Sequence, residues 1–130
     1  MREIEFRAWL KNRKKMRIVC AIDFSSNEVD CSGNDEYVGW YGLNEYELMQ
    51  WTGLKDINGT KIFEGDIVEI WYNFENEYFE EKTLHSRGVI KFDKGMFEVK
   101  FEGYNYYINA DGLTLEVIGN IYENPELLEV

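Results

Sequence analysis

The stretch from Gln50 to Ile70 reads QWTGLKDINGTKIFEGDIVEI, and it predicts two turns followed by a strand. In the first turn, Asp56 can accept a hydrogen bond from a backbone N–H two residues later, Asn58 tolerates a left-handed backbone, and Gly59 supplies a positive φ. Apolar residues lie on both sides of this turn, as they do in a β-hairpin.

The second turn, Glu64-Gly65-Asp66, comes directly before the expected strand. Gly65 permits a sharp bend, and the Asp66 carboxylate can satisfy a nearby backbone N–H. The strand from Ile67 to Tyr72 would place Val68, Ile70 and Tyr72 on one face and Glu69 on the other. We therefore assign a structural role to the turn residues of the whole stretch, which are Gly53, Asp56, Asn58, Gly59, Glu64, Gly65 and Asp66.

The D-x-N-G pattern at Asp56 to Gly59 resembles part of a calcium-binding loop. With Gly59 at the sixth position, an EF-hand would require a carboxylate where Leu54 stands and a bidentate Glu where Gly65 stands. Because both ligands are missing, no metal is assigned to this turn.

Three segments resemble the YopX family, a group of small proteins encoded by phages and prophages of bacteria. They are REIEFRAW at Arg2 to Trp9, LMQWTGLKDINGTKIFEGDIV at Leu48 to Val68, and VIGNIYENPELL at Val117 to Leu128. The resemblance implies a β-rich fold with an SH3-like β-barrel in the later part of the chain, and it implies no activity.

The remaining patterns also favour a mainly β fold. Residues 4–9 and 16–24 alternate as a strand pair joined by the turn Lys11-Asn12-Arg13-Lys14-Lys15, with Cys20 on the apolar face of the second strand. Residues 25–36 are polar and read as a loop. We expect an N-terminal β-hairpin and loop region over 1–50 and an SH3-like barrel over 51–130, with one continuous domain over 1–130 as the alternative.

Strands are also expected at Tyr46 to Trp51, Met96 to Phe101 and Leu113 to Val117. At the C-terminus, Asn124-Pro125-Glu126 offers a cap, a proline in the first turn and an acid in the first turn. This predicts a short C-terminal helix through Leu128.

The net charge of −11 is unevenly distributed along the 130 residues. Residues 1–17 carry seven Lys/Arg and two Asp/Glu, whereas the remainder carries seven Lys/Arg and twenty-three Asp/Glu. Because the acidic remainder repels phosphates, nucleic acid is disfavoured as a partner. A nucleic-acid-binding module that uses the basic turn Lys11 to Lys15 remains the alternative interpretation.

Cys20 and Cys31 form no CxxC pair, and the single histidine, His85, gives no zinc spacing. Reduced thiols, the absence of a signal peptide and the absence of a long apolar stretch predict a protein of the bacterial cytoplasm with no membrane contact. No cofactor or metal is expected. Exposed strand edges leave self-association open.

Catalysis is not expected. His85 lies in the polar stretch Thr83-Leu84-His85-Ser86, which reads as a loop end, and no glycine-rich phosphate loop follows a strand. No pair among the many carboxylates is distinguished by its spacing. The sequence therefore does not predict an enzyme.

The segment 73–86 mixes four glutamates with Phe74, Tyr78 and Phe79, and it reads either as an acidic hairpin tip or as a short helix. Long insertions between strands often carry function. We therefore expect an accessory protein of phage or prophage origin that acts as a non-catalytic β-barrel adaptor. It would bind a host or phage protein through Phe74, Tyr78 and Phe79.

Overall fold

The computed structural model describes residues 2–31, 39–101 and 104–129, and its chain divides into two compact units. Unit 1 spans Met1–Trp51 and unit 2 spans Thr52–Val130. The fold is mainly β, as the sequence predicts, with a six-stranded sheet of order β4-β3-β2-β1-β5-β6 and a five-stranded sheet of order β10-β9-β8-β7-β11.

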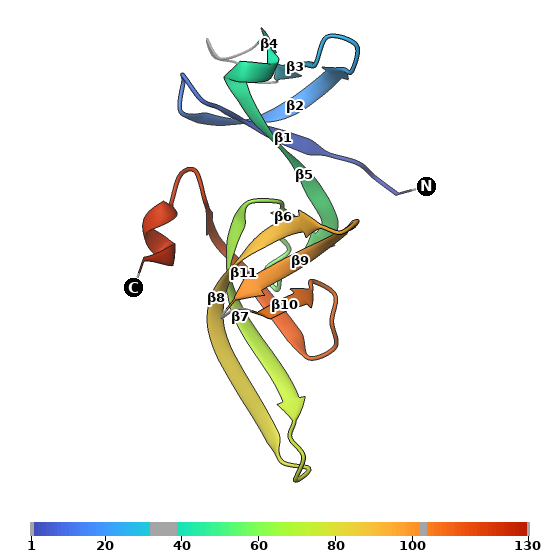
Figure 1. The fold of residues 1–130 in the computed structure, drawn as a ribbon, viewed down its shortest axis with the longest axis vertical. Helices are drawn as coiled ribbons and strands as arrows, with labels where there is room; N and C mark the ends of the chain where they lie inside the picture. The colour runs from blue at the N-terminus through green and yellow to red at the C-terminus, as the bar shows by residue number, and fades with distance from the viewer. Residues whose placement is uncertain (1, 32–38, 102–103, 130) are drawn as a thin grey trace. The chain divides into compact units, whose positions relative to one another are not determined.

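Unit 1 is built on the predicted N-terminal hairpin, which is confirmed (Figure 1). β1 pairs antiparallel with β2 on one side and with the first half of β5 on the other. A small core of Ala8, Leu10, Val29, Cys31, Tyr41 and Tyr46 lies on one face of these strands. The strands are β1 (Phe6–Leu10), β2 (Lys15–Asp23), β3 (Glu28–Cys31), β4 (Gly39–Tyr41) and β5 (Tyr46–Lys55), and a single 3-10 turn, η1 (Leu43–Glu45), precedes β5.

The expectation that Cys20 belongs to the core is wrong, because β2 contains a bulge at this residue. Val19 pairs with Cys31 and Ala21 pairs with Asp30, so Cys20 is the extra residue on β2. A bulge breaks the period-two alternation of a strand. Val19 and Ile22 consequently pack against the core, while Cys20 is exposed.

The loop predicted over 25–36 is wrong at Glu28–Cys31, which forms β3, whereas residues 25–27 lie in a turn as predicted. This strand has four residues, two of them polar, so its alternation in the sequence is too short to be distinguished from the surrounding turn residues. The structure shows that Val29 and Cys31 alternate into the core while Glu28 and Asp30 lie opposite them. The rest of that predicted loop, 32–36, lies outside the described residues.

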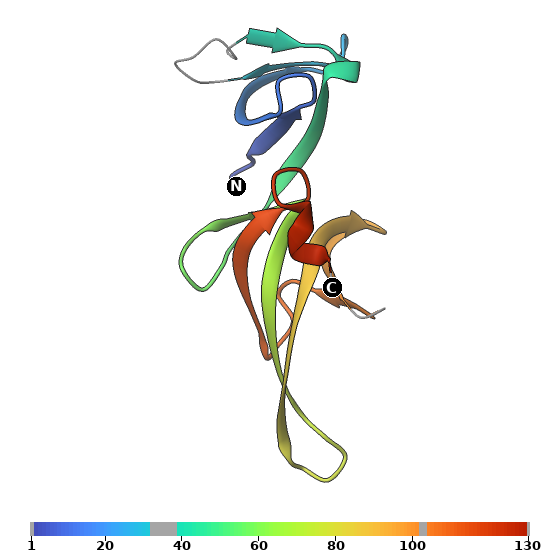
Figure 2. The same ribbon diagram turned by 90° about the vertical axis from the view of Figure 1, so that its left-hand side faces the viewer.

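Unit 2 contains the five-stranded sheet, shown from two sides in Figures 1 and 2. Its elements are β6 (Lys61–Phe63), β7 (Asp66–Glu75), β8 (Glu81–Asp93), β9 (Met96–Phe101), β10 (Tyr104–Tyr107), β11 (Leu113–Asn120) and the 3-10 turn η2 (Pro125–Leu128). Together with β7, the strands predicted at Met96 to Phe101 and Leu113 to Val117 are confirmed.

The predicted SH3-like barrel is not closed in the part of the chain that the structure describes. β10 and β11 form opposite edges of the five-stranded sheet. β5, which comes before β7 in the chain, is hydrogen-bonded to β1 on one side and to β6 on the other, and neither β5 nor β6 pairs as a strand with these edges. The sheet therefore stays open.

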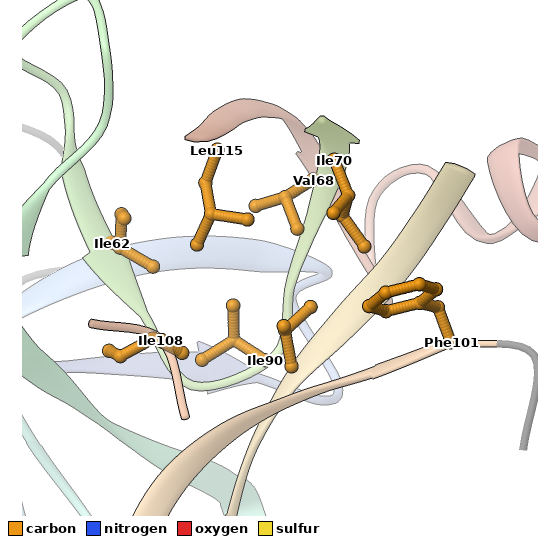
Figure 3. Close-up of a cluster of buried hydrophobic side chains, with 8 residues drawn as sticks. Ile62, Val68, Ile70, Ile90, Phe101, Ile108 and Leu115 are labelled. Carbon is orange, nitrogen blue, oxygen red and sulfur yellow. The ribbon is translucent and has the colours of Figure 1, made fainter. Parts of the chain in front are cut away.

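The core of unit 2 lies on the face of β7 that the alternation predicts. Val68 and Ile70 are fully buried, and they meet Ile90, Val99, Phe101 and Leu115 from the neighbouring strands (Figure 3). Gly88 is opposite Val68, and a Cβ at Gly88 would lie 2.5 Å from the carbonyl oxygen of Lys100. A glycine is therefore required where β8 passes β9.

The predicted C-terminal helix is wrong: Pro125–Leu128 forms one 3-10 turn, and the described residues contain no helix of seven or more residues. The Asn124 side chain does not cap this turn. Its Oδ1 instead accepts a hydrogen bond from the Asn120 N–H at 3.2 Å, which ties the segment back to the end of β11.

The bulge predicts different reactivities for the two thiols. The thiolate is the attacking form, and burial together with the charge of Asp30 raises the pKa of Cys31 to about 11. Iodoacetamide should therefore add one adduct, at Cys20, to the folded protein and two adducts to the protein in guanidinium, measured by intact mass. Folded Cys20→Ser should gain none, and a first adduct at Cys31 would contradict the bulge.

Candidate interaction surface

The predicted alternatives for residues 73–86 are resolved in favour of a hairpin. β7 and β8 stay paired up to Glu75 and Glu81, so the helix alternative is wrong. The pairing of β11 with β7 begins with Leu113 opposite Tyr72, and the pairing of β9 with β8 reaches Val89. Beyond Tyr72 and Leu84 the two strands therefore pair with each other, and one further backbone bond runs from the Asn73 N–H to the Gly112 carbonyl. Figures 1 and 2 show this two-stranded hairpin continuing past the other strands of unit 2.

Asn76 holds the turn at the end of this hairpin. Its Oδ1 accepts hydrogen bonds from the N–H groups of Tyr78 (2.9 Å) and Glu80 (3.0 Å). Its own backbone N–H donates to the Glu80 carbonyl, and its carbonyl accepts from the Phe79 N–H. We call residues Phe74 to Glu81 the acidic tip.

The turn at Asp56 has the same hydrogen bonds, residue for residue. Asp56 Oδ1 accepts from the N–H groups of Asn58 and Thr60, both at 2.9 Å. The Asp56 N–H donates to the Thr60 carbonyl, and the Asp56 carbonyl accepts from the Gly59 N–H. Gly59 has φ +83°, and the equivalent residue of the acidic tip is Phe79, with φ +61°.

The three aromatic residues predicted to bind a partner all lie at the acidic tip with exposed rings. Phe74 is 41% exposed, Tyr78 73% and Phe79 84%. Phe74 stacks on Tyr72, which contacts Tyr106, which in turn stacks on the buried Phe101, with centroid separations of 5.6, 5.0 and 4.9 Å. A continuous row of rings therefore connects the core of unit 2 to the acidic tip.

The glutamates of the acidic tip are crowded. Glu75 and Glu81 are direct cross-strand partners, and Glu77 and Glu80 lie in the turn between them. Like charges directly opposite each other destabilise a strand pair. Glu80 forms an ion pair with Lys82 at 3.1 Å, in which both side chains are about half exposed.

A second cluster, on the outer face of β7 and β8, was not predicted. Glu69 Oε2 lies 2.6 Å from His85 Nε2, and Glu69 Oε1 accepts a hydrogen bond from Arg87 Nε. The His85 ring stacks on Trp71 with a centroid distance of 5.0 Å. The expectation that His85 sits at a loop end is wrong, because His85 lies within β8 opposite Trp71.

The cluster depends on strand register, which the sequence alone does not supply. Glu69 pairs with Arg87 and Trp71 pairs with His85 only in the observed register. Burial raises the pKa of Glu69, but the hydrogen bonds from Arg87 and His85 outweigh burial and leave this pKa lowered. Because Arg87 Nη1 also donates to the Leu127 carbonyl, the cluster serves to hold the C-terminal turn η2.

The central turn residues act structurally in unit 2. Asp56 Oδ2 accepts a hydrogen bond from the Val117 N–H at 2.8 Å, and the neighbouring Ile57 N–H donates to the Leu115 carbonyl. Gly65, at φ +83°, donates to the Ile90 carbonyl and accepts from the Ile121 N–H. Asp66 is 1% exposed and accepts from the Phe63 N–H at 2.8 Å.

The other central residues lie in or beside these turns. Gly53, at φ +87°, lies in β5. Asn58 is exposed in the first turn, and Glu64 is half-buried beside Gly65. Gly53, Asn58 and Glu64 therefore lie outside the acidic tip, in β5 and in the turns on either side of β6.

The basic turn connects β1 and β2. Lys14 adopts a left-handed conformation with φ +54°, and Lys11 Nζ pairs with Glu47 at 3.1 Å, with both side chains partly exposed. Among the described residues, no group of three or more His, Cys, Asp or Glu is arranged to hold a metal ion. No helix in that part of the chain is long and apolar enough to cross a membrane.

A family model described as "YopX protein" matches residues 5–129. The crystal structure of protein EF1440 from Enterococcus faecalis is similar, with 32% identity, 99% of this chain and 100% of that chain covered, and a TM-score of 0.66. No curated protein gives a significant match.

The Asp56 geometry predicts a pH-dependent stability. Burial raises the pKa of Asp56, but hydrogen bonds from Val117, Thr60 and Asn58 outweigh it, so the folded-state pKa is lowered. The stabilisation is complete above the unfolded pKa of about 3.9 and decreases as the pH falls through it toward the folded value. In Asp56→Asn an amide N–H₂ would face the Val117 N–H, and we expect a loss of about 2 kcal/mol at pH 7.

Urea unfolding at pH 7, 5 and 3 measures this effect. The difference between the native chain and Asp56→Asn should shrink at the lowest pH, because protonation removes the charge that the variant already lacks. Asp93→Asn, in the turn between β8 and β9, is the matched control and should leave stability at pH 7 within about 0.5 kcal/mol of native. A constant difference at all three pH values would contradict a charged Asp56.

Proposed function

The chain belongs to the YopX protein family, and from this premise we propose that it is a non-catalytic accessory protein of phage or prophage origin that binds another protein through its acidic tip. The partner is a host or phage protein met in the bacterial cytoplasm. The two cysteines, neither of them in a disulfide, are consistent with that compartment.

The observation that carries the proposal is the conformation of Phe79. A left-handed backbone costs an L-residue about 1–2 kcal/mol, and bulky residues rarely adopt it. The same turn at Asp56 uses glycine at this position, yet Phe79 is held at φ +61° with 84% of its surface exposed. Strain kept at an exposed position by a large apolar ring supports a role in binding.

The charge of the acidic tip defines the chemistry of the partner. Glu75 and Glu81 face each other across the strands at a cost to hairpin stability, which supports a requirement for a strong local negative potential. A partner surface with an apolar depression for Phe79 and a rim of lysine or arginine would relieve both the exposure of the ring and the charge crowding.

The size of the acidic tip favours a modest affinity. Stable interfaces bury roughly 1,200–2,000 Å² in total, and a hairpin turn of eight residues supplies only part of this area. Aromatic anchors contribute most of the energy of such small contacts. The complex should therefore be transient and sensitive to salt.

A single substitution separates binding from stability. Phe79→Gly should raise the free energy of unfolding by about 1 kcal/mol, because glycine adopts a positive φ without strain. The same variant should lose the partner, because the most exposed ring of the acidic tip is removed. Thermal unfolding measures the first effect, and capture of tagged protein complexes from bacterial lysate, treated with nuclease and read by mass spectrometry, measures the second.

The matched control is Gly59→Phe, the reverse change in the equivalent turn. A Cβ at Gly59 meets nothing within 4 Å, so the expected loss of stability is that of the backbone alone, and partner capture should persist. A partner that binds Phe79→Gly as well as the native chain would contradict the proposal. Capture that disappears on nuclease treatment would favour nucleic acid at the basic turn Lys11 to Lys15 instead.

A further inference from the structure

The β1–β2 hairpin of unit 1 carries only positive charge. Residues 6–22, which span β1, the basic turn and most of β2, contain six Lys/Arg and no Asp/Glu. The chain as a whole has a net charge of −11, so this segment is opposite in sign to its context. We call residues 6–22 the basic hairpin.

One face of the basic hairpin also carries apolar side chains. Arg7 pairs with Ile18 and Trp9 pairs with Met16, so these four residues share the face opposite the core residues Ala8 and Leu10. Ile18 is 44% exposed, and the other three are half-buried. On this face the apolar side chains lie with Arg7 and next to the turn that carries Lys11, Arg13 and Lys14, whereas Lys15 and Arg17 pair with Leu10 and Ala8 on the other face. Apolar surface beside cations is the chemistry required of a partner for the acidic tip.

The acidic tip is opposite in charge to the basic hairpin, and like the basic hairpin it carries exposed apolar side chains. It carries four glutamates and three exposed rings within eight residues. Each hairpin presents apolar surface among side chains of predominantly one charge, and the two charges are opposite in sign; Lys11 pairs with the neighbouring Glu47, and Glu80 pairs with the neighbouring Lys82. Charge complementarity of this kind steers association and sets register.

We propose that the acidic tip of one molecule docks on the basic hairpin of a second copy of the same chain. The inference rests on the acidic tip being a binding surface, as proposed above, and it names a partner of that surface. Phe79 and Tyr78 contact the apolar side chains of the basic hairpin, and the glutamates face its lysines and arginines. Because each molecule contributes two different surfaces, the contact is heterologous and extends into chains or closed rings.

The contact is weak and governed by ionic strength. Exposed charges separated by more than the Debye length, about 10 Å at 0.1 M salt, are largely screened. Association should be strongest at about 0.02 M salt and high protein concentration, and it should be reversed at about 0.5 M salt. Sedimentation velocity of the full chain measures the weight-average mass under both conditions.

Two charge-reversal variants test the pairing. Lys14→Glu with Lys15→Glu changes the basic hairpin, and Glu77→Lys with Glu81→Lys changes the acidic tip. Each variant alone should sediment as a monomer at low salt, and an equimolar mixture of the two should associate again. Lys91→Glu with Lys94→Glu, on β8 and its turn, makes the same charge change elsewhere and should sediment like the native chain.

Three results would overturn the self-association: a native chain that is monomeric at low salt at all concentrations, variants that associate as the native chain does, or a mixture that stays monomeric. Salt-sensitive binding of a DNA duplex by a monomeric native chain, lost with Lys14→Glu and Lys15→Glu, would instead assign the basic hairpin to nucleic acid. The proposed function is judged separately, because it fails if Phe79→Gly retains its protein partners or if capture by the native chain disappears on nuclease treatment.

Discussion

The Asp56 carboxylate is the constraint on which unit 2 depends. Its two oxygens accept hydrogen bonds from the backbone N–H groups of Asn58, Thr60 and Val117. The first two close a turn, and the third fixes that turn to β11, sixty-one residues away. β11 is an edge strand held on its other side by β7, so this carboxylate, together with the Ile57 N–H bond to the Leu115 carbonyl, links the β5–β6 hairpin to the five-stranded sheet. A buried or half-buried carboxylate stays charged when backbone donors surround it, which is why the turn tolerates an ionised group.

Local chemistry made the turns predictable, and missing long-range information explains the errors. The Asp56 and Gly65 turns follow from residue types that favour one backbone geometry. Alternation located most of β7, β9 and β11, but it failed at Cys20, where a bulge breaks the period. The Glu69, His85 and Arg87 cluster requires a register that pairs Glu69 with Arg87, and no single-sequence pattern specifies that pairing. The prediction that the sheet closes into a barrel is wrong for the same reason, since strand order is a property of the whole fold.

The two equivalent turns separate structural from functional constraint within one chain. At Asp56 every choice lowers the free energy: the carboxylate has three backbone donors and Gly59 takes the left-handed position. At Asn76 the side-chain bonds are the same, but Phe79 takes the left-handed position and the flanking glutamates repel across the strands. Sequences that fold well are locally consistent, so a local conflict beside a matched, conflict-free turn indicates a requirement other than folding.

The acidic tip has two proposed partners, the basic hairpin of a second copy and a host or phage protein. The acidic tip is a single surface of eight residues, so a molecule that docks on a second copy cannot use the same tip for a host or phage protein. The two complexes therefore compete, and the weaker one dominates only at high local concentration of the chain itself. Because exposed charge pairs are screened at physiological salt, self-association should yield to any partner that buries the Phe79 ring in an apolar pocket. Self-docking would then keep the strained aromatic tip covered until such a partner is present.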